Sequence, residues 1–340
     1  MPAKRGSDAT QDSASLAHGV LEGHRRALAQ AITLIESTRS DHRAAASDLL
    51  QHLMPHAGHS IRLGISGVPG VGKSTFIEAL GNHIIDTGHR VAVLTVDPSS
   101  AISGGSILAD KTRMESLSRR PEAYIRPSPS GNTLGGVTRR SREALILCEA
   151  AGFNVVIVET VGVGQSETRV ADMTDMFMLL LLPGGGDELQ GIKRGIMELA
   201  DLVLINKADD KLQVLAERSA TEYRNALRLL HPRSADWNVA VQTCSARDGV
   251  GITEAWQVVL QHHDLLEASG QLLKRRALQA RDWMWSEVND SLVMVLQTDP
   301  EVQKQIPALE IAVSEGKIAP TNAAKQLLEI FLKRHEQWGE

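Results

Sequence analysis

The residues with the clearest chemical meaning lie at positions 67–74, where the sequence reads Gly-Val-Pro-Gly-Val-Gly-Lys-Ser. Glycines at this spacing allow a tight turn whose backbone N–H groups converge on an anion, and a following helix directs its positive end at the same point. In such a loop Lys73 reaches the β- and γ-phosphates and Ser74 offers its hydroxyl to Mg²⁺. We therefore expect phosphate contacts from Gly67, Val68, Pro69, Gly70, Val71, Gly72, Lys73, Ser74 and Thr75.

The flanks of this loop support that interpretation against a chance glycine-rich turn. Ile61–Ile65 is an apolar run typical of a buried strand, and Thr75–Ile85 has the spacing of a helix. A strand, a glycine-rich loop and a helix in this order are what a phosphate-binding loop requires.

A second motif, Asn206-Lys207-Ala208-Asp209, directly follows the apolar run Leu202–Ile205. The Asp209 carboxylate can accept from both N1–H and N2–H of guanine, a donor pair that adenine lacks. Two charge-assisted hydrogen bonds of about 1.5–3 kcal/mol each imply a preference of order 10²–10⁴. Asn206 would brace the loop, and Lys207 would lie along the purine face. An Asp that merely caps a helix is the alternative.

A third segment completes the expected guanine site. Thr243-Cys244-Ser245-Ala246 ends another strand-like run, and backbone N–H groups at Ser245 and Ala246 could meet the guanine oxygen. The two motifs together predict GTP as the nucleotide, which neither establishes alone.

Acidic residues at strand ends are the candidates for holding Mg²⁺ together with Ser74. Glu159 closes the run Val155–Val158, Asp97 closes another apolar run, and Asp110 lies in a polar segment. Mg²⁺ prefers octahedral oxygen ligands and keeps several waters, so carboxylates suit it. For Asp97 and Asp110 a capping role competes with metal binding.

The segment after Glu159 raises the question of how the attacking water is held. Gly162 can present its N–H to a γ-phosphate, but the next residue is Val163, where many GTPases have a water-orienting Gln. Gln165 lies two positions further on. We therefore expect slow hydrolysis by the protein alone, and faster hydrolysis when a partner reshapes the loop.

The pattern along the chain predicts an α/β fold with a mostly parallel sheet and helices on both faces. The helical spacing of Leu16–Met54 precedes the phosphate loop, and helices at Ile252–Ala268, Gln271–Leu296 and Thr321–His335 follow the last strand. The strand-like runs alternate with amphipathic stretches and lie at Ile61–Ser66, Val91–Val96, Val155–Glu159, Met176–Leu182, Leu202–Asn206 and Val239–Thr243.

Composition excludes several classes of protein. The 340 residues are 42% hydrophobic and 23% charged with a formal net charge of −5, which gives no support for binding nucleic acid or a membrane surface. The two cysteines, Cys148 and Cys244, do not make a disulfide framework, and Met1–Ala14 lacks the apolar core of a secretory signal. We expect a cytoplasmic protein. Arg139, Arg140 and Arg142 suggest a basic helix start, although a solvated face explains them equally well.

The motifs as a set resemble those of the ArgK/MeaB family of G proteins, which includes the methylmalonic aciduria type A proteins. The resemblance extends from about Leu16 to past Ala246 and is most specific at two long segments. These are Glu-Thr-Val-Gly-Val-Gly-Gln-Ser-Glu, from Glu159, and Gly-Gly-Gly-Asp-Glu-Leu-Gln-Gly-Ile-Lys, from Gly184.

We expect residues 1–15 to be disordered. The resemblance implies a Rossmann-like P-loop G domain at 58–268, an N-terminal helical extension at 16–57 and a C-terminal helical dimerisation arm at 269–340. It implies a homodimer that uses GTP to gate cofactor loading and to protect or reactivate an adenosylcobalamin-dependent acyl-CoA mutase. It places Asp97, Asp110 and Glu159 around Mg²⁺, and switch regions near Pro98–Arg113, Glu159–Arg169 and Gly184–Arg194. The residues taken as catalytic are Lys73, Gln165 and Lys193.

Physics alone favours an ordinary connector for the glycine loop at 184–186, and the resemblance overrides that interpretation. Two other functions stay open. An ATP-dependent kinase or transport-linked ATPase, as in older labels of this group, would need adenine selectivity. A metallochaperone GTPase for nickel or zinc enzymes would carry a Cys or His cluster near the nucleotide.

Overall fold

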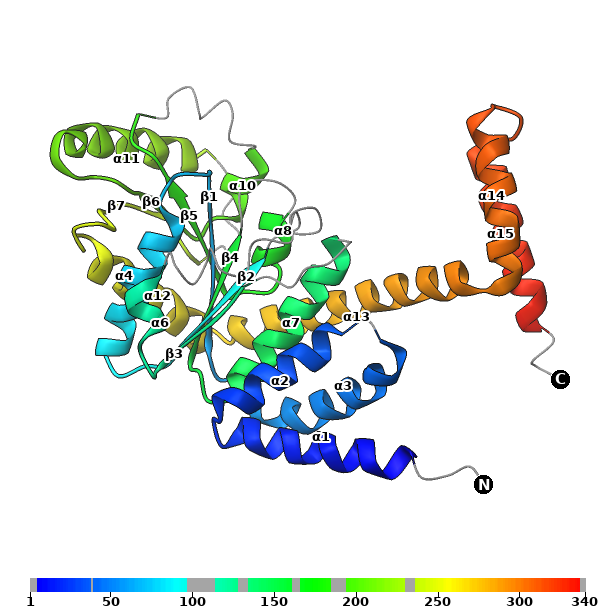
Figure 1. The fold of residues 1–340 in the computed structure, drawn as a ribbon. Helices are drawn as coiled ribbons and strands as arrows, with labels where there is room; N and C mark the ends of the chain where they lie inside the picture. Colours follow the sequence, from blue (N-terminus) through cyan, green and yellow to red (C-terminus); the bar gives the residue numbers. More distant parts are fainter. Residues whose placement is uncertain are drawn as a thin grey trace. The chain divides into compact units, whose positions relative to one another are not determined.

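The computed structural model describes residues 5–37, 39–96, 114–127, 134–160, 166–184, 194–229 and 236–336 (Figure 1). The helices within these residues are α1 (Arg5–Leu21), α2 (Arg25–Glu36), α3 (Ser40–Leu53), η1 (Met54–His56), α4 (Lys73–Asp86), α6 (Glu115–Ser118), α7 (Leu134–Ala150), α8 (Ser166–Ala171), α10 (Arg194–Leu199), η2 (Asp210–Leu212), α11 (Gln213–Leu227), α12 (Ile252–Ala268), α13 (Gln271–Thr298), α14 (Pro300–Ser314) and α15 (Pro320–Glu336). None of these helices is long and apolar enough to cross a membrane.

A seven-stranded sheet forms the centre of the fold. Its strands are β1 (Ile61–Gly67), β2 (Val91–Val96), β3 (Ala123–Arg126), β4 (Val155–Thr160), β5 (Met176–Leu181), β6 (Leu202–Ile205) and β7 (Ala240–Thr243). The spatial order is β3-β2-β4-β1-β5-β6-β7, and every paired neighbour runs parallel. The α/β fold with a parallel sheet, predicted from the alternating pattern, is confirmed.

The position of β1 determines where a ligand can bind. β1 pairs with β4 on one side and β5 on the other, and the chain moves outward in opposite directions from it. Open parallel sheets bind ligands at the carboxyl ends of the strands where the order reverses in this way. The glycine-rich loop leaves the carboxyl end of β1, so it lies at this switch point.

Helices cover both faces of the sheet, and burial on both faces explains why the strands read as continuous apolar runs. On one face α4, α6 and α12 pack on residues such as Leu63 and Val93. On the other face α2, α3, α7 and α8 pack on residues such as Val156 and Phe177. On this face α10 and α11 cover β5 and β6 (Figure 1).

Three elements differ from the sequence-based expectation. The chain is helical from Arg5, whereas we expected no regular structure before residue 16. β3 was not predicted, because its four residues lie between Pro121 and Pro127, and proline is typical of loops. α14 was missed because prolines stand at 300 and 307, but Pro300 occupies the first turn, where proline is tolerated, behind the capping side chain of Asp299.

The chain divides into two compact units, residues 1–277 and 278–340. The first unit contains the sheet and also the first turns of α13. There Arg276 donates from Nε and Nη2 to the carboxylate of Asp175 at 2.9 and 2.6 Å, and from Nη1 to the carbonyl of Gly58 at 2.5 Å. The buried Asp175 therefore ties the start of α13 to the base of the sheet.

The second unit consists of the rest of α13 with α14 and α15. α14 and α15 pack against each other, with Val302 and Ala323 among the buried residues. The unit also exposes many large apolar side chains, namely Leu278, Met284, Trp285, Val288, Leu292, Val293, Val295, Ile311, Leu328 and Leu332.

Candidate nucleotide site

The glycine-rich loop joins β1 to α4, as its sequence predicts. Gly70 and Gly72 have φ values of 80° and 92°, which side chains other than glycine rarely adopt. At Gly72 a Cβ atom would also stand 2.9 Å from Nδ2 of Asn206, and at Gly67 it would stand 2.5 Å from the carbonyl of Leu180. The loop therefore needs glycine both for its turn and for the close approach of its neighbours.

Lys73 begins α4 and turns back over the loop. Its Nζ donates to the carbonyl of Gly67 at 2.7 Å and to that of Val68 at 3.4 Å, and the side chain is largely buried. The crest of the loop at Pro69 and Gly70 is exposed. The ammonium group thus lies inside a loop that is open to a ligand, at the positive end of a 14-residue helix.

An oxygen-rich pair lies beside Lys73, at the carboxyl end of β4. The Ser74 hydroxyl donates to Oε1 of Glu159 at 3.3 Å, and Glu159 is buried. Next to it, Thr160 donates to the Ser66 hydroxyl at 2.8 Å, so the ends of β4 and β1 are joined. Hydroxyl and carboxylate oxygens are suitable ligands for Mg²⁺.

No cluster of three or more His, Cys, Asp or Glu side chains that could hold a metal ion occurs among the described residues. Two of the predicted metal ligands, Asp97 and Asp110, lie outside those residues. Gly162, Gln165 and Lys193 lie outside them too, so their predicted roles stay predictions.

Asn206 connects the phosphate loop to the expected guanine site. Its Nδ2 donates to the carbonyl of Val71 at 2.8 Å, while its Oδ1 accepts from the backbone N–H of Ala246 at 3.1 Å and from Sγ of Cys244 at 3.5 Å. The side chain is 2% exposed. One buried amide therefore fixes the distance between the loop after β1 and the loop after β7.

The Asp209 carboxylate lies at the same edge of the sheet, held by the loop after β7. Its Oδ2 accepts from the Ser245 hydroxyl at 3.1 Å, and the side chain is 13% exposed. The preceding Lys207 has a left-handed φ of 59° and an exposed side chain. This turn lets Ala208 donate to the carbonyl of Cys244 at 2.9 Å, which ties the two loops together.

Arg247, a positively charged residue beside Asp209, was not predicted from the sequence. Nη2 of Arg247 lies 3.8 Å from Oδ2 of Asp209 and 3.0 Å from Oδ2 of Asp210, and Nε lies 3.0 Å from Oδ1 of Asp248. Hydrogen bonding from Arg247 lowers the pKa of Asp248, and bonding to Asp248 and Asp210 raises the pKa of Arg247. The signal available in the sequence was the position of Arg247, directly after Ser245-Ala246.

The structure thus brings the predicted residues of four distant segments to one edge of the sheet. Lys73, Ser74 and Glu159 lie at the carboxyl ends of β1 and β4, and Asn206, Asp209, Ser245 and Ala246 lie at those of β6 and β7. An anion bound by the phosphate loop and a base bound near Asp209 would contact two loops, and Asn206 is hydrogen-bonded to both of them.

Known proteins with similar sequences match this chain over nearly its whole length. The chain is 56% identical to a putative GTPase of Caulobacter vibrioides over 94% of its own length and 98% of that protein. It is 50% identical to the mitochondrial methylmalonic aciduria type A homolog of Mus musculus, covering 93% of this chain and 79% of the mouse protein.

The solved structure of a LAO/AO transport system kinase matches with a TM-score of 0.75 and 37% identity, covering 98% of this chain and all of that one. The model of the family described as methylmalonyl Co-A mutase-associated GTPase MeaB matches residues 28–301. The chain is therefore a GTPase that belongs to the MeaB family.

Proposed function

We propose that this protein binds GTP with Mg²⁺ at the edge described above and uses its hydrolysis to assist an adenosylcobalamin-dependent acyl-CoA mutase. In this role it would gate the loading of adenosylcobalamin and protect or reactivate the mutase. The observation that carries the nucleotide part is the buried Asn206, whose amide bonds both the phosphate loop and the loop beside Asp209.

The residues of the site have distinct roles in the proposed hydrolysis. The backbone N–H groups of the loop and Lys73 stabilise the charge that develops on the phosphoryl oxygens as water attacks the γ-phosphate in line. Ser74 and Glu159 would hold Mg²⁺, which supplies neutralising charge when bound. Lys193 and Gln165 are the proposed switch residues that act in the complex with a partner.

Guanine selectivity falls to Asp209 in this proposal. Its carboxylate would accept from N1–H and N2–H of the base, while Ser245 and Arg247 hold it in place. The backbone N–H groups near Ala246 would meet the guanine oxygen. Adenine would leave the Asp209 carboxylate without these two donors, and that penalty is the basis of the discrimination.

The proposed partner and assembly have support of their own. The family description names a mutase-associated GTPase, and the mouse relative is named for methylmalonic aciduria. For the homodimer, the support is the set of exposed apolar side chains on the second unit, including Trp285 and Leu292, which soluble proteins usually cover by association. We propose a cytoplasmic location.

A reconstitution tests this role directly. Purified protein is mixed with an acyl-CoA mutase, adenosylcobalamin and either GTP or a non-hydrolysable analogue, and both cofactor loading and the lifetime of mutase activity are followed. We expect hydrolysis-dependent loading and a longer active lifetime, lost with Lys73→Ala and kept with Lys211→Ala. Equal loading and lifetime with and without the protein would refute the chaperone role.

A second candidate, an ATP-dependent kinase, is suggested by the similar solved protein that is called a transport system kinase. It requires that ADP bind at least as tightly as GDP. Titration of the two nucleotides in magnesium buffer separates the candidates, and we expect GDP to bind roughly 10²–10⁴ times more tightly.

A further inference from the structure

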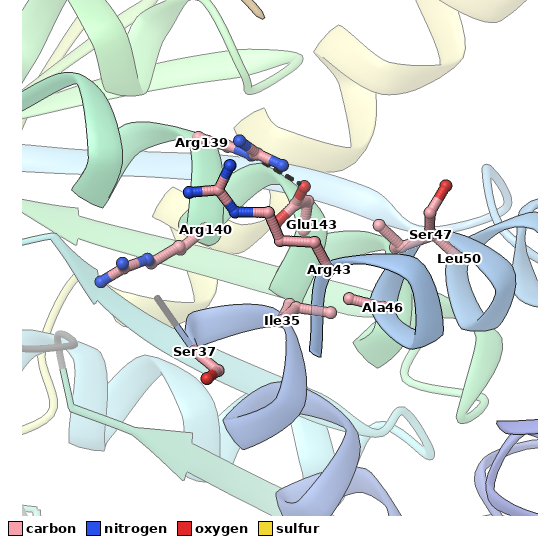
Figure 2. A pocket seen from close by; sticks show the side chains of 9 residues that line it. All are labelled: Ile35, Ser37, Arg43, Ala46, Ser47, Leu50, Arg139, Arg140 and Glu143. Atoms are coloured by element: carbon pink, nitrogen blue, oxygen red, sulfur yellow. Dashed lines mark hydrogen bonds and ion pairs between the residues drawn. The ribbon is translucent and has the colours of Figure 1, made fainter. Parts of the chain in front are cut away.

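A small cavity lined by arginines lies on the side of the protein that carries the N-terminal helices. It measures about 200 Å³ and is lined by Ile35, Ser37, Arg43, Ala46, Ser47, Leu50, Arg139, Arg140 and Glu143. These residues come from the end of α2, from α3 and from α7, and none belongs to the phosphate loop or the guanine motif (Figure 2).

The charge of the lining is unbalanced. Three arginines and one glutamate belong to the lining, which gives its side chains a formal charge of +2. Arg139 donates from Nε to Oε1 of Glu143 at 3.2 Å, and Glu143 is buried, so that carboxylate is already engaged. Among the residues drawn in Figure 2, no hydrogen bond or ion pair engages the Arg140 guanidinium, which points away from Glu143. In Figure 2, Arg43 reaches from α3 toward the arginines of α7.

Like charges held close together repel each other, and a counter-charge between them relieves that repulsion. Arginine also presents a planar fork of donors that matches the oxygens of phosphate better than any other side chain does. Ser37 and Ser47 add hydroxyls to the lining, and Ile35, Ala46 and Leu50 add apolar side chains.

The size of the cavity limits the ligand. At about 200 Å³ it is smaller than the roughly 300–1,000 Å³ of sites for drug-sized ligands. A phosphate group fits such a volume, whereas a whole nucleotide does not. A phosphate monoester or inorganic phosphate, both close to dianionic at neutral pH, also matches the charge of the lining.

We propose that this cavity is a second oxyanion site, separate from the nucleotide site, which binds a phosphate dianion between α3 and α7. The dianion would join Arg43 of α3 to Arg139 and Arg140 of α7, and so fasten the N-terminal helices to α7. Its source is either free phosphate or the phosphoryl group of a small ester.

The test is titration calorimetry on the full chain saturated with GDP, so that the phosphate loop is occupied. Inorganic phosphate, glycerol phosphate, malonate and potassium chloride are compared at equal ionic strength. The cavity variant is Arg43→Gln with Arg140→Gln, and the matched control is Arg26→Gln with Arg228→Gln, two exposed arginines outside the cavity. Because the phosphate loop is the same in every variant, a difference between them reports the cavity alone.

We expect phosphate binding in the wild type and the control, and roughly 10- to 100-fold weaker binding in the cavity variant. Equal or tighter binding of glycerol phosphate identifies an ester as the source, and binding of inorganic phosphate alone identifies the free anion. Malonate that binds as tightly as phosphate would overturn the proposal, as would equal affinities in the cavity and control variants.

A second measurement keeps the test decisive if the double variant folds poorly. Arg140→Gln alone leaves Arg43 and the Arg139–Glu143 pair intact. A ligand that binds only the folded state raises the unfolding temperature. We expect phosphate to raise it more in the wild type than in Arg140→Gln, while the two proteins unfold at similar temperatures in chloride. Equal phosphate-dependent shifts would refute the site.

Discussion

Replacement of Asn206 by alanine should be among the most costly single changes near the nucleotide site. The side chain makes two hydrogen bonds to buried backbone groups, the carbonyl of Val71 and the N–H of Ala246. Each bond contributes about 1 kcal/mol, and each buried group left without a partner costs about 1–3 kcal/mol. Since part of that cost is recovered when water or a small shift satisfies one group, we expect a loss of about 2–4 kcal/mol in the free energy of unfolding.

The assay is denaturant unfolding of the full chain followed by circular dichroism, without nucleotide. Asn82→Ala is the matched control, since the Asn82 amide also donates twice, to the carbonyl of Glu78 and the hydroxyl of Ser116, each at 2.9 Å. Those contacts are partly exposed, and water can replace them, so we expect a loss below about 1 kcal/mol.

A nucleotide titration then separates the structural role of Asn206 from a purely local one. If the amide fixes the spacing of the two loops, Asn206→Ala weakens GDP and guanosine binding together, because the base and the phosphates no longer meet their contacts in one pose. A variant as stable as Asn82→Ala, with GDP affinity equal to wild type, would refute the assignment of Asn206 as the brace.

Three further outcomes follow from the same geometry. Lys73→Ala should reduce GTP hydrolysis to background in a phosphate-release assay, and undiminished turnover would remove the loop lysine from the mechanism. Asp209→Asn should weaken binding of a fluorescent GTP analogue roughly 10²–10⁴-fold without creating ATP binding; a gain of ATP binding would count against the proposed guanine contacts. Burial raises the pKa of Cys244 to about 12 and also raises that of Cys148, so both thiols stay protonated below pH 9. Neither should react with a disulfide reagent at pH 8 until the protein is unfolded, and rapid labelling of the native protein would contradict this.

The parts of the fold that were predictable from sequence are those whose signal is local. Ile61–Gly67 and Lys73–Asp86 could be recognised because an apolar strand, a glycine loop and a helix follow each other without interruption. β3 could not, since its four residues lie between Pro121 and Pro127 and form a strand only by pairing with β2. The same holds for α14, where the prolines at 300 and 307 obscure a helix that Asp299 caps.

The site shows the same limit in another form. The residue types at Lys73, Ser74 and Asp209 have a chemical meaning wherever they occur in such motifs, so they could be named in advance. Their connections could not, because Asn206 bonds Val71 across 135 positions of sequence and Ala246 across 40. Arg247 escaped notice for the same reason, since its acidic partners Asp209 and Asp210 become neighbours only when β6 and β7 pair.

These long-range connections give the site a property that neither motif has by itself. The loop after β1 and the loops after β6 and β7 lie on opposite sides of β5, so direct backbone pairing cannot hold them at one distance. A single buried amide spans that gap, and it bonds to Val71, which directly precedes the left-handed Gly72 and Lys73. Any displacement of the loop after β6, which carries Asn206 and Asp209, is therefore transmitted to the start of α4. A base that fits poorly near Asp209 would consequently disturb the phosphate contacts as well, so selectivity for guanine should show in the rate of hydrolysis as well as in affinity.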